Sequence, residues 1–172
     1  MRGNCGRMAR AAGVALCLLV FAGSGAKADS QLGITAGVGA FDFLHNHTAA
    51  EGRFELRFGQ SLFIFKPLVG IFVTTKGSVY TYGGFRAEFA IGKHFMIIPV
   101  AAVGDYEKGG GKDLGSHLEF KTGVEFDYVM DNGVKFGPAF DHVSNAGIDK
   151  TNPGEENLML MVTVPFGLIA GH

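Results

Sequence analysis

Apolar and polar residues alternate with a period of two along most of this chain. The clearest segment is residues 116–130, SHLEFKTGVEFDYVM, where Leu118, Phe120 and Phe126 fall on one side and Glu119 and Lys121 on the other. Successive side chains of a β-strand point to opposite faces, so this alternation predicts strands and not helices. Each predicted strand has one apolar face and one charged face.

Eight segments show this alternation, and we predict one strand for each. They span residues 31–43, 50–59, 62–75, 78–91, 94–104, 116–130, 133–145 and 156–169. Most are close to the roughly 9–11 residues with which a tilted strand crosses a bilayer. Short links alternate with long ones, and Asn132-Gly133 in one short link is a strong signal for a tight turn. Short turns at one end and long loops at the other are typical of an outer-membrane barrel.

Two closed barrels fit this pattern: a soluble lipocalin-like barrel with an apolar interior, and a membrane barrel with an apolar exterior. The charged faces favour the membrane barrel, because their acidic and basic side chains can pair with one another inside a narrow interior. The residues concerned are Glu51, Arg53, Glu55, Arg57, Arg86, Glu88, Glu119, Lys121, Glu125, Asp127, Lys135 and Asp141. The sequence therefore predicts an all-β fold, an eight-stranded antiparallel transmembrane β-barrel whose interior is filled by side chains. The soluble barrel is the alternative.

Prolines and tyrosines lead to two further expectations. Pro67, Pro99, Pro138 and Pro165 fall within predicted strands, where each removes a ladder donor, so we expect bulges or frayed pairing there.

Aromatic rings are enriched at membrane interfaces, and we expect the tyrosines to lie there. They are Tyr80, Tyr82, Tyr106 and Tyr128.

The first 28 residues have the features of a cleaved signal peptide. Three arginines precede an apolar stretch at residues 11–23, and Ala26-Lys27-Ala28 fits a cleavage site, so residues 29–172 are predicted to form a single barrel domain. Both cysteines lie in the removed segment. So do four of the 15 basic residues and none of the 16 acidic ones, which leaves a net charge of −5. This charge argues against nucleic acid as a partner.

The last predicted hairpin brings three candidate catalytic groups to one face. His142 and Ser144 continue the apolar face of residues 133–145, and Glu156 continues the apolar face of the final strand. If His142 pairs with Glu156, their Cβ atoms lie about 4.5–5.5 Å apart. A serine hydroxyl is a weak nucleophile until a histidine takes its proton, and the histidine in turn needs a carboxylate to orient it.

Two points about this hairpin remain open on the residues alone. Glu155 competes with Glu156 for the acid role, and only strand parity favours Glu156. The polar residues could also simply mark where the membrane ends. If the site is catalytic, the backbone N–H groups of Asn145, Ala146 and Gly147 could hold an oxyanion.

The sequence HVSNAG at 142–147, with a glutamate fourteen residues after the histidine and Asn-Pro-Gly-Glu before the last strand, resembles the lipid A deacylase (PagL) family. Members of that family are outer-membrane barrels that hydrolyse the ester-linked acyl chain at the 3-position of lipid A. The resemblance implies that Ser144 is the nucleophile, His142 the general base, Glu156 the orienting acid and Asn145 an oxyanion-site residue. Unlike many outer-membrane barrels, the chain does not end in an aromatic residue.

These observations predict a hydrolase of the bacterial outer membrane that acts on lipid A or lipopolysaccharide in the outer leaflet and needs no metal or other cofactor. A homodimer is compatible with the sequence, which does not decide the oligomeric state. The alternatives are a non-catalytic barrel for adhesion or envelope structure, and a lipid A palmitoyltransferase. His45-Asn46-His47 has no carboxylate at ligand spacing in the sequence, so we expect a solvated loop there.

Overall fold

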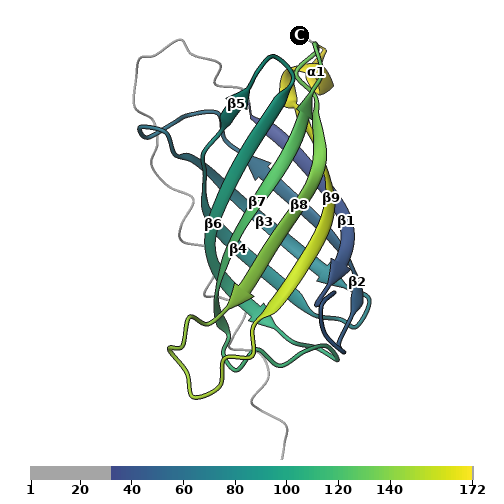
Figure 1. The fold of residues 1–172 in the computed structure, drawn as a ribbon, viewed down its shortest axis with the longest axis vertical. Coiled ribbons are helices and arrows are strands. Elements are labelled where there is room, and N and C mark those ends of the chain that lie inside the picture. The colour runs from purple at the N-terminus through teal and green to yellow at the C-terminus, as the bar shows by residue number, and fades with distance from the viewer. Residues whose placement is uncertain (1–31, 172) are drawn as a thin grey trace, which may run out of the picture.

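The computed structural model describes residues 32–171 and shows a closed barrel of tilted antiparallel strands (Figure 1). The predicted signal peptide lies outside the described residues. The elements are β1 (Gly33–Phe41), β2 (Ala49–Arg57), β3 (Lys66–Thr74), β4 (Val79–Arg86), β5 (Phe89–Ile91), β6 (Phe95–Glu107), β7 (Leu118–Val129), β8 (Lys135–Ser144), β9 (Glu155–Pro165) and α1 (Phe166–Ala170). The strand order is β4-β3-β2-β1-β9-β8-β7-β6, and β6 closes the ring by pairing with β4.

The ring of the barrel has eight strand positions, and we call each position a stave. The strands β4 and β5 together occupy one stave. Both pair with β6 in the same register, Arg86 opposite Val100 and Phe89 opposite Ile97. Between them Pro99 offers no N–H to the ladder, although its carbonyl still accepts a hydrogen bond from Ala87 N at 3.1 Å. This confirms the predicted eight-stranded antiparallel barrel.

Pairing is interrupted at Pro99, between β4 and β5, and at Pro138, which confirms the expectation of frayed pairing there, but neither proline produces a bulge. In the ladder between β7 and β8, Glu125 lies opposite Ala139 and Tyr128 opposite Phe136, so the register is the same on both sides of Pro138. These prolines remove ladder bonds without inserting a residue. Because the register never shifts, the inward and outward parity of the strands is preserved from end to end.

The charged faces point into the barrel, as predicted. Arg57 is fully buried, and its guanidinium contacts Glu55 of its own strand (Nε to Oε2, 2.8 Å) and Glu125 of β7 (Nη1 to Oε2, 2.9 Å). Arg53 pairs in the same way with Glu51 and with Asp141 of β8. Each buried cation therefore has two carboxylates from different staves, which compensates for its removal from water.

Between this network and the end with the long loops, which is the lower end in Figure 1, the interior is rich in aromatic rings. Phe41, Phe72, Tyr80, Tyr82 and Tyr106 are all buried and in mutual contact, with ring centroids 5.0–6.5 Å apart. The expectation that tyrosines lie at the membrane interface is therefore wrong for the three buried ones. Their hydroxyls find polar partners inside the barrel, such as the Glu119 carbonyl for Tyr80 at 2.9 Å.

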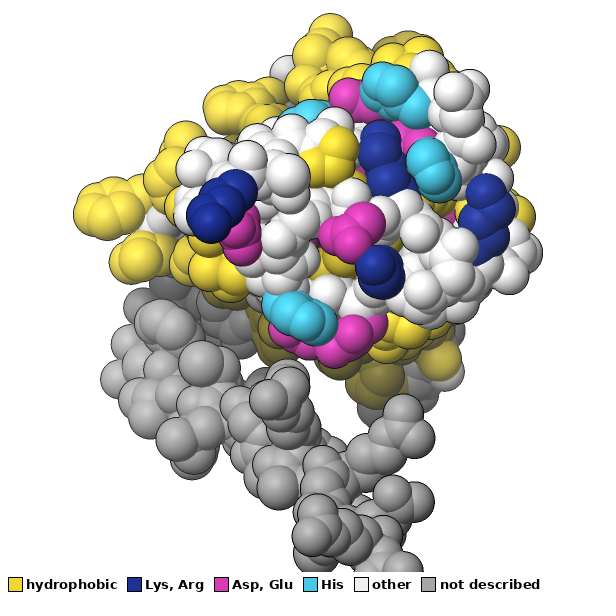
Figure 2. All heavy atoms as spheres, turned by 90° about the horizontal axis from the view of Figure 1, so that it is seen from below, with side chains coloured by type: hydrophobic (Ala, Val, Ile, Leu, Met, Phe, Trp, Pro, Cys, Tyr) yellow, Lys and Arg dark blue, Asp and Glu magenta, His cyan; other side chains and the backbone are white. Residues whose placement is uncertain are grey.

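The outer surface carries the apolar face of every stave, so the soluble alternative with an apolar interior does not apply. Exposed side chains around the wall include Phe54, Ile71, Phe85, Val103, Phe126, Leu158 and Leu160. Seen from the loop end, hydrophobic side chains project around the rim, while charged and histidine side chains are gathered across the end (Figure 2).

Two predicted strand limits lie four residues from the observed ones. Lys66 begins β3, because residues 62–65 form a tight turn closed by the Leu62–Phe65 bridge. Residues 166–169, predicted as the end of the last strand, belong to the short helix α1, which follows Pro165. Within residues 32–171, no helix has both the length and the apolar character to cross a bilayer.

The pairing of Arg57 leads to a stability prediction. Arg57→Met leaves Glu55 and Glu125 without their shared cation, and removing one partner of a buried ion pair typically costs about 3–5 kcal/mol. We expect a clearly lower midpoint in urea unfolding of the detergent-solubilised barrel, followed by circular dichroism. Lys93→Met, at the exposed turn after β5, is the matched control and should leave the free energy of unfolding within about 0.5 kcal/mol of wild type. Equal midpoints for the two variants would contradict the role given to Arg57.

Candidate active site

The candidate site lies at the loop end of the hairpin formed by β8 and β9. His142 is directly opposite Glu156, Phe140 opposite Leu158, and Phe136 opposite Val162, which is the register predicted from parity. His142 and Ser144 are half-buried on the outer wall, whereas the alternating Asp141 and Val143 are fully buried inside. The structure thus places both candidate groups on the lipid-facing side.

Glu156, and not Glu155, approaches the histidine. Nδ1 of His142 lies 3.2 Å from Oε1 of Glu156, in a hydrogen bond in which an ionised carboxylate can only accept. Glu155 turns inward, is fully buried and accepts a hydrogen bond from Asn157 Nδ2 at 2.9 Å. With its Nδ1 proton directed to Glu156, His142 has Nε2 free to act as a base.

Ser144 and the imidazole face the same small space in front of Gly154. A Cβ atom built on Gly154 would lie 3.3 Å from His142 Nε2 and 3.6 Å from Ser144 Cβ. Among the described residues, no hydrogen bond joins the serine hydroxyl to the imidazole. Such bonds are often long before substrate binds and shorten in the complex.

The predicted oxyanion segment is held by its own hydrogen bonds. Asn145 is fully buried, and its Nδ2 donates to the carbonyls of Leu114 (3.0 Å) and Thr151 (2.7 Å). Its backbone N–H donates to Asn152 Oδ1, and its Oδ1 accepts from Gly147 N. In the part of the chain that the structure describes, Ala146 N–H has no such partner. Ala146 is therefore the member of the predicted segment with a free donor, and Asn145 supports the turn.

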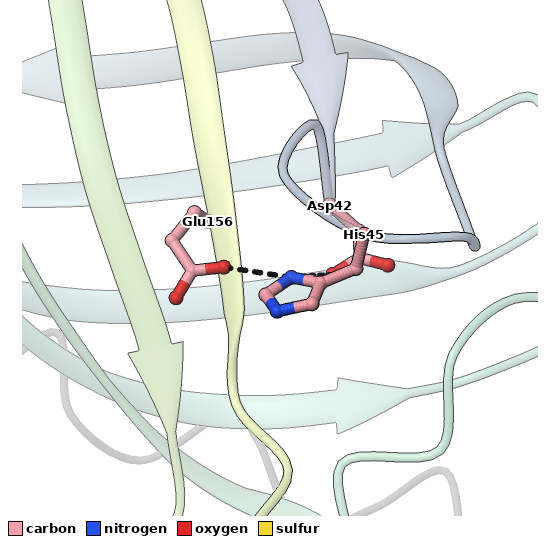
Figure 3. A group of neighbouring side chains, drawn as sticks. All are labelled: Asp42, His45 and Glu156. Carbon is pink, nitrogen blue, oxygen red and sulfur yellow. Dashed lines mark ion pairs between the residues drawn. The ribbon is translucent and has the colours of Figure 1, made fainter.

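The loop between β1 and β2 also reaches the site, which the sequence did not predict. Nδ1 of His45 lies 3.1 Å from Oε2 of Glu156 and 3.3 Å from Oδ1 of the buried Asp42 (Figure 3). Asp42 in turn accepts a hydrogen bond from Lys112 Nζ at 2.6 Å. The expectation of a merely solvated loop is wrong for His45. Its carboxylate neighbour Glu156 is far away in sequence, and only the pairing of β1 with β9 brings them together.

Gly154 is a second residue that the sequence analysis did not single out. Its φ is +58°, and a methyl group there would lie 2.7 Å from Cε1 of His142, closer than non-bonded carbon atoms approach. The only signal for it was its place in the Asn-Pro-Gly-Glu segment before the last strand. Glycine at this position leaves room for the imidazole and for whatever approaches it.

Comparison with known proteins agrees with this geometry. Residues 46–165 match the family described as lipid A 3-O-deacylase (PagL). The crystal structure of the outer membrane enzyme PagL superposes with a TM-score of 0.59 at 24% identity, covering 77% of this chain and 99% of that one. A designed transmembrane β-barrel gives a TM-score of 0.55 at 10% identity, covering 78% and 93% of the two chains. No curated protein sequence matches.

The fold and its neighbours define an outer-membrane β-barrel enzyme, because the family match spans most of the chain and the barrel wall is apolar outside. The chain belongs to the lipid A 3-O-deacylase (PagL) family. It is accordingly a lipid A deacylase of the outer membrane.

The close approach of Gly154 to His142 predicts a specific loss of activity. Gly154→Ala should lower lipid A deacylation by at least tenfold, because the new methyl group displaces the imidazole. The barrel itself should still fold, as judged by heat-modifiable migration on gels. Gly92→Ala is the control: its φ of +65° imposes a similar backbone strain, but nothing lies within 4 Å of the added Cβ. A Gly154→Ala variant as active as Gly92→Ala would show that the contact is unimportant.

Proposed function

We propose that this protein is a serine esterase that removes the 3-hydroxyacyl chain linked to the 3-position of lipid A, with Ser144, His142 and Glu156 as its catalytic triad. The observation that supports this most is the His142–Glu156 hydrogen bond on the outer wall. The wall just below it carries apolar side chains such as Phe140 and Leu158. Polar groups at the edge of hydrocarbon are costly to desolvate, so their presence favours a functional role.

The site suits an amphiphile that lies in the membrane. The exposed Phe140 and Leu158 lie one step closer to the bilayer centre than His142 and Glu156. Phe43 packs edge-on against Phe140, with ring centroids 6.0 Å apart, and extends this apolar surface toward β1. An acyl chain lying along these side chains would bring its ester bond to the level of Ser144, at the depth of the lipid head groups.

The proposed reaction has two halves. Oγ of Ser144 attacks the ester carbonyl carbon while its proton passes to Nε2 of His142, and Glu156 stabilises the imidazolium. The tetrahedral intermediate then expels the sugar 3-oxygen, which takes the proton from Nε2 and leaves an acyl-serine. Water attacks the acyl-serine with His142 again as base, and the 3-hydroxy fatty acid is released with free Ser144.

Ala146 N–H is the best candidate for the oxyanion donor. Its N–H is free among the described residues, and it follows the nucleophile by two positions, at a φ of +55°. Asn145 and Gly147 are tied to each other and to the loop, so their role is to hold this turn in shape. Donors fixed before the reaction need no reorganisation when the oxyanion forms.

The triad is tested by mass spectrometry of lipid A from cells that express each variant. The wild-type protein should remove one 3-hydroxyacyl group, and fragmentation should assign the loss to the 3-position. Ser144→Ala and His142→Ala should lower the rate by about 10³-fold or more, since triad members act as a unit. Thr81→Ala, which removes a hydroxyl from the opposite wall, should deacylate as wild type does.

Other outcomes separate the alternatives. A gain of acyl mass would indicate an acyltransferase, and an unchanged spectrum from a correctly folded wild-type barrel would indicate a structural role. Loss of a chain that persists in Ser144→Ala would retain the deacylase but refute the serine mechanism.

A further inference from the structure

The loop histidine His45, which the proposed mechanism does not use, lies in a group of three side chains that shares Glu156 with the triad. Asp42, at the end of β1, His45, in the following loop, and Glu156, on β9, converge on one point at the loop end of the barrel (Figure 3). We propose that these three side chains form a binding site for a transition-metal dication of the zinc type, and that the bound ion inhibits deacylation. The inhibitory effect rests on the proposed function, whereas metal binding itself does not.

The spacing of the three ligand atoms fits a common ion. His45 Nδ1 is 3.1 Å from Glu156 Oε2 and 3.3 Å from Asp42 Oδ1, and all three atoms lie within 4.8 Å of one another. Ligand atoms around a four-coordinate zinc ion, with bonds of about 2.0–2.2 Å, are roughly 3.2–3.6 Å apart. One nitrogen and two carboxylate oxygens also form a ligand set that zinc accepts, with water in the fourth position.

One ligand atom has no hydrogen-bond donor among the described residues. Oε2 of Glu156 is buried and accepts no hydrogen bond from any described residue, although the His45 ring nitrogen lies 3.1 Å away. Oε1 of the same carboxylate is engaged by His142. A buried carboxylate oxygen with no donor is costly, and a cation between it and His45 would satisfy both. The half-exposed imidazole of His45 leaves the position open to ions from solution.

The charged side chains around the proposed site set its affinity for the metal ion. Asp42 and Glu156 together carry two negative charges, and the ammonium of Lys112, 2.6 Å from Asp42 Oδ1, offsets one of them. A carboxylate oxygen has two lone pairs, so Asp42 can keep Lys112 while it binds the metal. The lysine still repels the ion, and it therefore weakens binding without preventing it.

The bound ion would act on the triad through the shared carboxylate. A dication on Oε2 withdraws charge from Glu156 and places positive charge close to His142. The imidazolium that forms when Ser144 attacks is then less stable. Deacylation slows although the nucleophile, the base and the substrate surface are unchanged.

Metal binding is tested by titrating ZnCl₂ into the purified, folded barrel in detergent micelles and measuring the heat. Wild type should bind one zinc ion. His45→Gln should bind at least tenfold more weakly, because it loses the nitrogen ligand, and Lys112→Gln should bind about tenfold more tightly, because it loses the repelling charge. His47→Gln is the matched control, since this exposed histidine two residues further along contacts Asp42 only at 3.9 Å. Absence of binding in wild type, or equal affinities in all four proteins, would overturn the site.

Inhibition is measured separately with the same proteins. Zinc should slow lipid A deacylation by wild type at least fivefold, and a chelator should restore the rate. For His45→Gln, the zinc concentration that gives half inhibition should rise at least tenfold, and for Lys112→Gln it should fall. A barrel that binds zinc as predicted yet never deacylates lipid A would refute the proposed function and leave the metal site standing. Zinc binding with no effect on an active enzyme would refute the inhibitory role.

Discussion

The pairing of buried charges inside the barrel fixes the orientation of everything else. Arg53 and Arg57 each lie between a carboxylate of their own strand and one from the opposite side of the lumen, so the charged faces of β2, β7 and β8 must all point inward. Since side chains alternate along a strand, the same parity sends His142 and Ser144 outward. A shift of one residue in β8 would place Asp141 in lipid and the candidate catalytic groups inside the barrel.

This arrangement resolves an apparent conflict between fold and chemistry. Ion pairs and aromatic rings fill most of the lumen of this eight-stave barrel. The proposed chemistry is therefore on the wall, where β8 and β9 end and the hydrocarbon gives way to the loops. The wall is rigid because every strand around it is paired, and a rigid support holds an imidazole and a carboxylate in register without help from a mobile lid.

The sequence predicted the barrel well because alternation is a local signal. Parity alone paired His142 with Glu156 and separated Glu156 from Glu155, and the uninterrupted register made that reasoning valid. Strand parity did not predict two features of the structure. The tyrosines at the loop end are buried because aromatic rings occupy the lumen there beside the charged groups, as Lys121 lies over the Tyr82 ring. Alternation of apolar and polar residues does not predict this. The approach of His45 and Asp42 to Glu156 depends on the closure of β1 against β9, between residues far apart in the chain.

The three candidate triad residues all lie in one hairpin, residues 135–165. From outside the hairpin, the Leu114 carbonyl accepts a hydrogen bond from Asn145 and supports the turn. A designed barrel with 10% identity shares the overall architecture, so the remaining staves need only keep their alternation and their internal charge balance. The hairpin thus carries all three proposed triad side chains, and the other six staves support it. Grafting these residues onto an unrelated eight-stranded membrane barrel of matching height is the natural route to a new lipid-surface hydrolase.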